Sequence, residues 1–305
     1  YQFYQCDADK SEKSMLPRDA SPIFSNTRKG SHNKITGGIA MEFKMLRFVV
    51  EDAIAVITLD YAPTLNALDM NLALELEAAL KQAEEDDAVK VVVLTGAGRA
   101  FCGGGDIRFM KAHCEEPDFA DTSMGPLAGK LSEIVLYIKK MKKLVICAVA
   151  GAAAGGGCNL ALGCDFVYAA DNAKFLQAFV GIALIPDTSG GYMLPRAIGT
   201  HRAMDMFVTG RPVSAQECFE LGLVKEVTTA EELMPKAMAF AKKLAAGPTL
   251  AYANMKKMMF VSMYQGFEEF IKAEVALQNE CANSADFKEG ITAFLEKRKA
   301  KFTGK

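Results

Sequence analysis

Two runs of three glycines constrain this chain most, because each follows a stretch that predicts a buried strand. Residues 103–105 follow the apolar run VKVVVLTGAGRAFC, and residues 155–157 follow LVICAVAGAAA. Glycine allows positive φ and a close approach to the main chain. Where a helix starts at such a turn, its first N–H groups can face an anion. If N–H groups from both turns converge on one point, they would make an oxyanion hole. The alternative interpretation is that the glycines only permit tight packing of helices against the sheet.

Strand-like and helix-like segments alternate around these glycines. Apolar, β-branched runs predict strands, and apolar residues recurring every three or four positions predict helices. Strands are expected over 45–51, 53–60, 89–96, 144–151, 164–171 and 173–179, and helices over 68–83, 127–141 and 158–164. Beyond Gly190 the pattern is mostly helical. The alternation predicts an α/β fold, with the continuous strand 89–96 covered on both faces.

Three segments are expected along the chain. Residues 1–40 are polar and lack a sustained period, so they predict a disordered extension that need not belong to the native chain. Residues 41–247 are expected to form the core. Residues 248–305, after the Gly-Pro pair at 247–248, are expected to form a C-terminal helical region.

Composition excludes several classes of function. The 35 basic and 37 acidic residues give no electrostatic case for nucleic acid. The longest apolar stretch, residues 144–158, is shorter than the roughly 18 residues that suggest a membrane span. Eight cysteines without a CxxC pair predict free thiols in a reducing, cytoplasmic compartment. The three histidines lack metal-ligand spacing, so no metal site is predicted, and neither His113 nor His201 accompanies a nucleophile motif.

Gly96 and Gly98 form a GxG after a predicted strand, a pattern that can indicate a dinucleotide site. Phe101 occupies the third glycine position, and no acidic ribose partner follows a second strand. The Rossmann interpretation is therefore disfavoured.

Three motifs in order resemble the crotonase, or enoyl-CoA hydratase/isomerase, superfamily. They are FCGGGDI (101–107), AVAGAAAGGGCNLALGCD (148–165) and FLQAFVGIALIPDTSGGYMLPRAIG (175–199), and ADFKEGITAFLEKRKAKF (285–302) resembles the closing helix of that family. The resemblance spans about residues 45–305 and implies a spiral of ββα repeats. It also implies an acyl-CoA thioester substrate, no cofactor beyond that coenzyme A, and a homotrimer or hexamer joined through residues 248–305.

The resemblance also assigns residues to the site. The backbone N–H groups of Gly105 and Gly156 would hold the thioester oxygen as it becomes an enolate. Positions expected to bind substrate or coenzyme A are Ala62, Thr64, Asn66, Cys102, Gly103, Asp106, Ile107, Asn159 and Phe179. Phe294 and Lys297 match positions that reach the coenzyme A of a neighbouring subunit, although Lys297 also suits a solvated helix end.

The choice of reaction rests on three positions. Hydratases of the family use two glutamates, and this chain has Asn159 and Phe179 in their places. Asp187 remains, and it aligns with the acid/base of the 1,2-epoxyphenylacetyl-CoA isomerase and related enoyl-CoA isomerases. One base in an apolar pocket suits an isomerisation, where the same group removes and returns a proton. Asp187-Thr-Ser before a helix also fits a helix N-cap.

Two alternatives stay open at this point, and a third is disfavoured. An enoyl-CoA hydratase would need Asp187 to activate water alone, and a non-catalytic acyl-CoA-binding protein would keep the pocket without turnover. A dehalogenase, in which the aspartate at this position acts as a nucleophile, is disfavoured. That branch of the family pairs the aspartate with a histidine on the helix before the second glycine run, and this chain has Ser132 near that place.

The methionines of MKKMMFVSM (255–263) are expected to fill the core.

Overall fold

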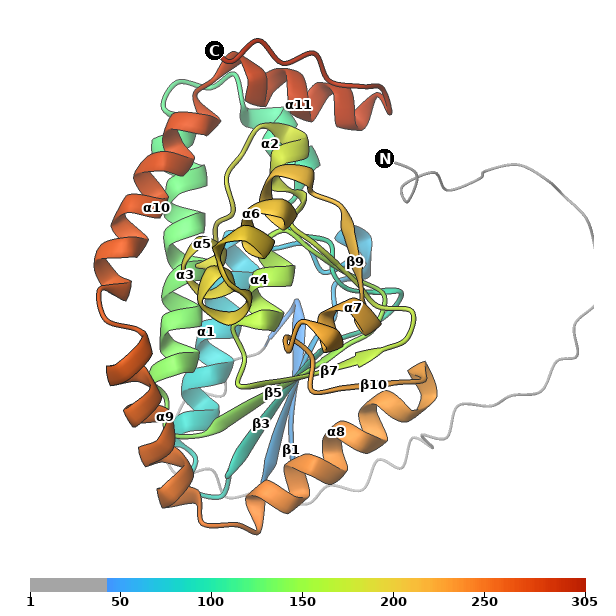
Figure 1. Ribbon diagram of the computed structural model, residues 1–305, viewed down its shortest axis with the longest axis vertical. Helices are drawn as coiled ribbons and strands as arrows, with labels where there is room; N and C mark the ends of the chain where they lie inside the picture. Colours follow the sequence, from blue (N-terminus) through green and yellow to red (C-terminus); the bar gives the residue numbers. More distant parts are fainter. Residues whose placement is uncertain (1–42) are drawn as a thin grey trace, which may run out of the picture. The chain divides into compact units, whose positions relative to one another are not determined.

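Two β-sheets hold the two glycine turns in the structure, a computed structural model that describes residues 43–305 (Figure 1). The larger sheet has the order β1-β2-β3-β5-β7-β10, with β1 antiparallel to β2 and the other pairs parallel. Its strands are β1 (Leu46–Glu51), β2 (Ile54–Leu59), β3 (Val91–Gly96), β5 (Leu144–Val149), β7 (Phe166–Ala170) and β10 (Glu226–Thr228). The extension predicted over 1–40 lies outside the described residues.

The smaller sheet takes one strand from each repeat. Its order is β4-β6-β8-β9, parallel except for the last pair. The strands are β4 (Ala100–Cys102), β6 (Ala152–Ala154), β8 (Lys174–Leu176) and β9 (Pro212–Ser214). Along the chain, β3, β5 and β7 are each followed by one of these strands, and helices α2 (Ile107–His113) and α4 (Gly156–Leu162) close the first two units. The predicted α/β class and the ββα repeat are confirmed.

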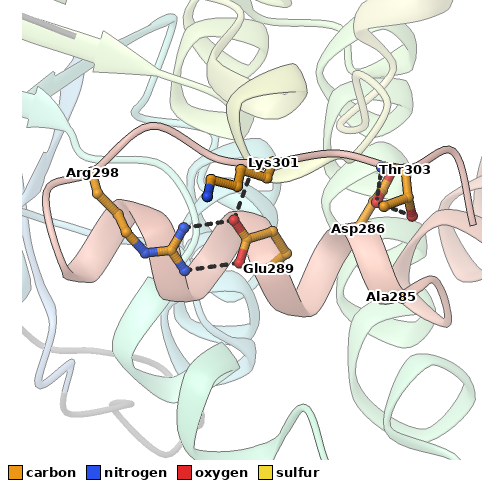
Figure 2. A pocket seen from close by; sticks show the side chains of 6 residues that line it. All are labelled: Ala285, Asp286, Glu289, Arg298, Lys301 and Thr303. Atoms are coloured by element: carbon orange, nitrogen blue, oxygen red, sulfur yellow. Dashed lines mark hydrogen bonds and ion pairs between the residues drawn. The ribbon is translucent and has the colours of Figure 1, made fainter.

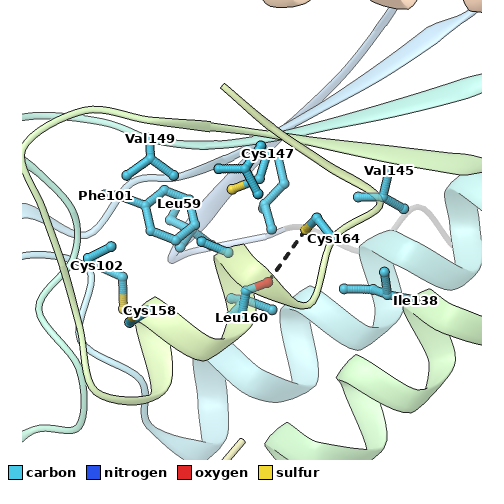
Figure 3. Close-up of a cluster of buried hydrophobic side chains, with 14 of the residues drawn as sticks. Leu59, Phe101, Cys102, Ile138, Val145, Cys147, Val149, Cys158, Leu160 and Cys164 are labelled. Carbon is cyan, nitrogen blue, oxygen red and sulfur yellow. Dashed lines mark hydrogen bonds between the residues drawn. The ribbon is translucent and has the colours of Figure 1, made fainter. Parts of the chain in front are cut away.

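Both faces of the larger sheet are covered. Alternate residues of β3 point to opposite sides, so Val92 and Leu94 join one apolar cluster while Val91 and Val93 join another. Helices α1 (Met70–Glu85) and α3 (Gly125–Lys140) cover the first face, and α8 (Ala230–Ala245) covers the second (Figure 1). Figure 3 shows the first cluster packed beneath the strands. This explains why the strand sequences are continuously apolar rather than alternating.

The remaining helices follow the sheets. They are α5 (Gly190–Ile198), α6 (Thr200–Thr209), α7 (Ala215–Glu220), α9 (Thr249–Met263), α10 (Phe267–Ala282) and α11 (Ala285–Leu295). Helix α10 runs along α3 (Figure 1). Residues 43–305 pack as one unit, and the functional division at residue 247 stays a prediction. No helix within residues 43–305 is long and apolar enough to cross a membrane.

The C-terminal tail folds back over α11. Asp286 accepts hydrogen bonds from the Thr303 and Gly304 amides, both at 2.7 Å, and Arg298 makes a two-pronged ion pair with Glu289 (Figure 2). These contacts fix the chain just beyond Lys297, one of the expected coenzyme A residues.

Several predicted element boundaries differ from the structure by one or more residues, and two of the differences affect the site. Helix α1 begins at Met70 rather than 68, because the Asp69 side chain caps it by accepting from the Leu72 amide at 2.8 Å. The strand expected over 173–179 ends at Leu176, because its partner β6 is only three residues long. Phe179 therefore lies in a 3-10 helix, η4 (Ala178–Ile182).

Candidate active site

The two glycine turns lie against each other. A Cβ added to Gly104 would stand 3.0 Å from the Ala154 carbonyl oxygen, and Gly104 has φ +91°. Only glycine takes that conformation without strain. Leu68, which precedes α1, pairs with this turn: its amide donates to the Gly104 carbonyl at 2.7 Å and it forms a parallel bridge with Gly105. This hydrogen bond uses the Gly104 carbonyl and not the Gly105 amide.

Gly156 starts α4 beside the carboxyl group of Asp187. A Cβ on Gly156 would lie 2.7 Å from Thr188 Oγ1, 3.0 Å from Leu68 Cδ1 and 3.5 Å from Asp187 Oδ1. The amides of a first helical turn have no intrahelical acceptor and so can meet an anion. Leu68 thus contacts both glycine turns, and the structure brings Gly105, Gly156 and Asp187 into one neighbourhood.

The side chain of Asp187 is buried and does not cap a helix. Thr188 Oγ1 donates to Oδ1 at 2.8 Å, and Gln278 Nε2 donates to Oδ2 at 2.9 Å. Helix α5 has Ser189 at its N-cap and no side-chain capping bond, so the capping interpretation is wrong. Burial raises the pKa of Asp187 to about 6. The hydrogen bonds from Thr188 and Gln278 oppose this rise and favour the ionised carboxylate.

Asn159 fixes the backbone that carries this carboxyl group. Its Nδ2 donates to the Asp187 carbonyl at 2.7 Å, and its Oδ1 accepts from Gln177 Nε2 at 2.7 Å. The following residues, Thr188 and Ser189, have φ of +54° and +62°, a left-handed conformation that is costly for side chains other than glycine. Several bonds around the turn therefore hold Asp187 in place.

Helix α10 supplies two residues that sequence reasoning missed. Gln278 accepts from the Ile185 amide at 3.1 Å as well as donating to Asp187. Glu274, one turn earlier, accepts from the Ser189 amide at 3.2 Å and from the Ser132 hydroxyl of α3. A signal was present: the buried stripe of α10 runs Phe267, Ile271, Glu274, Gln278, Ala282, with two polar residues at core positions.

An apolar wall adjoins the second glycine turn. The Phe179 ring lies 3.6 Å from the position of a Cβ on Gly155, and Phe179 is buried. It belongs to a cluster formed by α2, η4, α10, α11 and the π-helical segment η3 (Ala120–Met124). The members are Met110, Cys114, Phe119, Ala120, Met124, Phe179, Ile182, Leu184, Ala282, Phe287 and Ile291, with Ile107, Cys281 and Phe294 partly buried against them.

The expected coenzyme A residues near the first glycine turn divide into exposed and structural ones. Ala62 is exposed and Thr64 half-buried, in a 3-10 helix. Asn66 is buried: its Oδ1 accepts from the Tyr61 amide, and its Nδ2 donates to three carbonyls of residues 97–101, so its side chain shapes the loop. Gly103 is tied to this loop, since its amide donates to the Leu65 carbonyl at 2.9 Å.

Four other expected residues contribute in different ways. Asp106 caps α2 by accepting from the Arg108 and Phe109 amides. The Cys102 thiol points into the core, where burial raises its pKa to about 12 (Figure 3). Phe294 packs against the cluster that contains Phe179, whereas Lys297 is exposed just after α11.

The described residues hold neither a metal-binding cluster nor a disulfide at this site. Within residues 43–305, no group of three or more His, Cys, Asp or Glu side chains could hold a metal ion. The seven cysteines in the same range are free thiols. The arrangement offers one ionisable carboxyl group beside Gly156, amide donors and an apolar wall.

Comparison with known proteins gives consistent matches over this whole region. Residues 50–305 match the family model "Enoyl-CoA hydratase/isomerase". The chain is 38% identical to a probable enoyl-CoA hydratase of Rhodobacter capsulatus, covering 87% of this chain and 100% of that protein. It is 36% identical to the 1,2-epoxyphenylacetyl-CoA isomerase of Escherichia coli, covering 86% and 100%. The crystal structure of an enoyl-CoA hydratase from Mycobacterium avium subsp. paratuberculosis superposes with a TM-score of 0.77 at 29% identity, covering 86% and 100%.

Proposed function

Since the chain belongs to the enoyl-CoA hydratase/isomerase, or crotonase, family and has its α/β fold, we propose that it is an enoyl-CoA isomerase. Family membership makes it an enzyme acting on acyl-CoA, with relatives of both reaction types. The proposal for isomerisation rests on one observation. Asp187 is the carboxyl group beside Gly156, while the amide Asn159 and the apolar Phe179 occupy the places expected for the two acids of a hydratase.

The proposed reaction moves a double bond toward the thioester. The amides of Gly105 and Gly156 hold the thioester oxygen. The Asp187 carboxylate removes a proton from C2 of a 3-enoyl-CoA, and the electron pair delocalises onto that oxygen as a dienolate. Asp187 then returns the proton to C4, which leaves a 2-enoyl-CoA. Stabilisation of the enolate by the two amides supplies the largest part of the rate enhancement.

Glu274 does not restore a hydratase pair in this proposal. Its Oε1 is used by the Ser132 hydroxyl and the Ser189 amide. A hydratase that uses a pair of carboxyl groups would need both of them to face one water. Phe179 and the surrounding apolar cluster instead favour exclusion of water from the reacting carbons.

Product analysis tests the proposal. The purified protein is mixed with a 3-enoyl-CoA or a 2-enoyl-CoA, and products are followed by chromatography and mass spectrometry. Interconversion at constant mass supports the isomerase. A gain of one water would make the chain a hydratase, and binding without turnover across a panel of thioesters would make it an acyl-CoA-binding protein.

We expect kcat/KM of the isomerase to fall at low pH, about tenfold per pH unit below an apparent pKa of about 6. The base must be ionised in the free enzyme, so activity rises with pH through this value. Thr188→Val removes a donor that favours the carboxylate, so the midpoint should move upward by about half a unit or more. The matched Thr188→Ser variant keeps the hydroxyl and should keep the midpoint. A midpoint that Thr188→Val leaves unmoved would contradict the assignment to Asp187.

Substrate binding follows from the same proposal. Ala62, Thr64, Cys102, Gly103, Asp106 and Ile107 would border the coenzyme A through their backbone, with Asn66 shaping the loop. Phe294 and Lys297 would approach the coenzyme A of a neighbouring subunit.

We also propose a cytoplasmic location, because the free cysteines of residues 43–305 suit a reducing compartment.

We also propose a homotrimer or a dimer of trimers. The methionines of 255–263, expected in the core, are instead largely exposed on α9, so that prediction is wrong. The exposed apolar residues of α9 are Leu250, Met255, Met258, Met259, Val261 and Met263. Such a patch favours burial against another subunit. Light scattering should give three or six times the mass of one chain, and Met258→Glu should lower it. A monomeric wild type would contradict the proposal.

A further inference from the structure

A second buried carboxyl group lies close to the proposed base. Glu274 is 2% exposed, and it reaches the Asp187 turn from α10. It belongs to the same helix face as Gln278, which holds the Asp187 carboxyl group directly. The proposed mechanism assigns Glu274 no part in the chemistry, so its burial calls for another explanation.

The contacts of Glu274 connect three elements. Oε1 accepts from the Ser189 amide, two residues after Asp187, and from the Ser132 hydroxyl of α3, while Oε2 has no hydrogen-bond partner among residues 43–305. A buried carboxylate with one unpaired oxygen would carry a large desolvation cost. Two neutral donors recover little of that cost, so the arrangement favours the protonated acid.

We propose that Glu274 is a positioning residue that acts as a neutral acid and holds the Asp187–Ser189 turn in its catalytic conformation. Ser189 has φ +62°, a costly backbone conformation, and it is buried, so its amide needs an acceptor. Asn159 holds the turn at the Asp187 carbonyl, Gln278 at the carboxyl group and Glu274 at the Ser189 amide. Because Glu274 is uncharged, Asp187 remains the ionised carboxyl group of the pair.

The electrostatics agree with this geometry. Burial raises the pKa of Glu274, the donors Ser132 and Ser189 lower it and the negative charge of Asp187 raises it, with a net value of about 8. Asp187, with a pKa of about 6, ionises first. Among the described residues, Asp187 is the charged group that acts on Glu274; α3 presents Ser132 and the turn presents a backbone amide.

The inference rests on the proposed function and is tested with three variants of the full-length protein. Glu274→Gln keeps a neutral side chain with an acceptor oxygen, and Glu274→Leu removes the acceptor. Glu280→Leu, at an exposed position of the same helix, is the control. We expect Glu274→Leu to lower kcat about 10- to 100-fold with little change in KM, because displacement of a catalytic group is costly. Glu274→Gln and Glu280→Leu should stay within about threefold of wild type, with the acid midpoint unmoved in Glu274→Gln.

Two kinetic results would overturn the inference. Equal losses in Glu274→Gln and Glu274→Leu would mean that the carboxyl group itself transfers protons. Unchanged kcat in Glu274→Leu would mean that the contact does not position the base.

Thermal melting gives a readout that needs no isomerase activity. The folded protein holds the Glu274 proton more tightly than the unfolded chain does, so wild type loses stability between about pH 4.5 and about pH 8. Glu274→Gln cannot lose this proton, so its melting temperature should rise relative to wild type across that range. A constant difference would overturn the neutral-acid assignment. A wild type without isomerase activity that still shows this trend would reject the proposed function and retain the neutral buried acid.

Discussion

Asp187→Asn is expected to lower the kcat of isomerisation by a factor of about 10² to 10⁴, because it removes the group that carries the proton. The pocket should otherwise persist. Asparagine can accept from Gln278 Nε2 with Oδ1 and donate to Thr188 Oγ1 with Nδ2, which reproduces both contacts of the carboxyl group. Steady-state kinetics with a 3-enoyl-CoA measure the loss, and KM should change little.

The same variant should be more stable than wild type at neutral pH. Burial raises the Asp187 pKa to about 6, so the folded protein binds this proton more tightly than the unfolded chain. The associated stability is present at acid pH and is lost as pH rises through about 6, by an amount on the order of 3 kcal/mol. At pH 7.5 the melting temperature of Asp187→Asn should be higher than that of wild type, and this difference should shrink near pH 4. Wild-type activity in this variant would remove Asp187 from the mechanism.

Gly156→Ala is expected to lower kcat/KM by a factor of about 10² to 10³, comparable to the loss of an oxyanion donor. The added Cβ would stand 2.7 Å from Thr188 Oγ1 and 3.0 Å from Leu68 Cδ1, so one of these groups must move. Thr188 donates to Asp187, and Leu68 pairs with Gly105. The clash therefore disturbs the base and the amide donors together, and steady-state kinetics report the loss.

Two other glycines provide controls for this steric argument. A Cβ on Gly105 would meet the Met110 Cε atom at 2.5 Å, the far end of a flexible side chain, so Gly105→Ala should cost about tenfold or less. A Cβ on Gly181 meets nothing within 4 Å, so Gly181→Ala should match wild type. Equal losses at Gly156 and Gly181 would show that the effect comes from general backbone changes rather than from this site.

The features predictable from sequence are those set by local pattern. A continuous apolar run such as 91–96 removes its side chains from water only when both faces of the strand are buried. In the structure α1 and α3 cover one face of β3 and α8 covers the other. The glycine triplets at 103–105 and 155–157 predicted close backbone approach, and the two turns do pack together.

Two of the element boundaries were predicted wrongly because contacts with neighbouring segments set them. Leu68 has the spacing of the α1 stripe, but Asp69 caps the helix and releases Leu68 to pair with Gly105. The strand was expected to continue through residues 177–179, but β6 offers no partner beyond Ala154. In both cases the neighbouring chain, rather than local propensity, set the boundary.

The support of Asp187 could not be predicted because it comes from distant parts of the chain. Gln278 lies 91 residues from Asp187, and Glu274 lies 85 residues from Ser189. Their spacing showed polar residues on a buried helix face, but only the packing of α10 along α3 identifies what they touch. The position of the α9 methionines could not be predicted for the same reason. Composition alone does not show whether a stripe of methionines packs in the core or lies on the surface.

Proton exchange in D₂O tests the central claim most directly. Wild type, Asp187→Asn and Glu274→Gln are each incubated with a 3-enoyl-CoA, and double-bond position and deuterium content are followed by mass spectrometry and NMR. The account predicts double-bond migration in wild type and in Glu274→Gln, and its loss in Asp187→Asn. Deuterium enters the acyl chain at C2 or C4 to the extent that the protonated Asp187 exchanges with solvent before it returns the proton, and this exchange is lost with migration in Asp187→Asn. Migration and exchange at the wild-type rate in Asp187→Asn, or addition of water in place of migration, would contradict it.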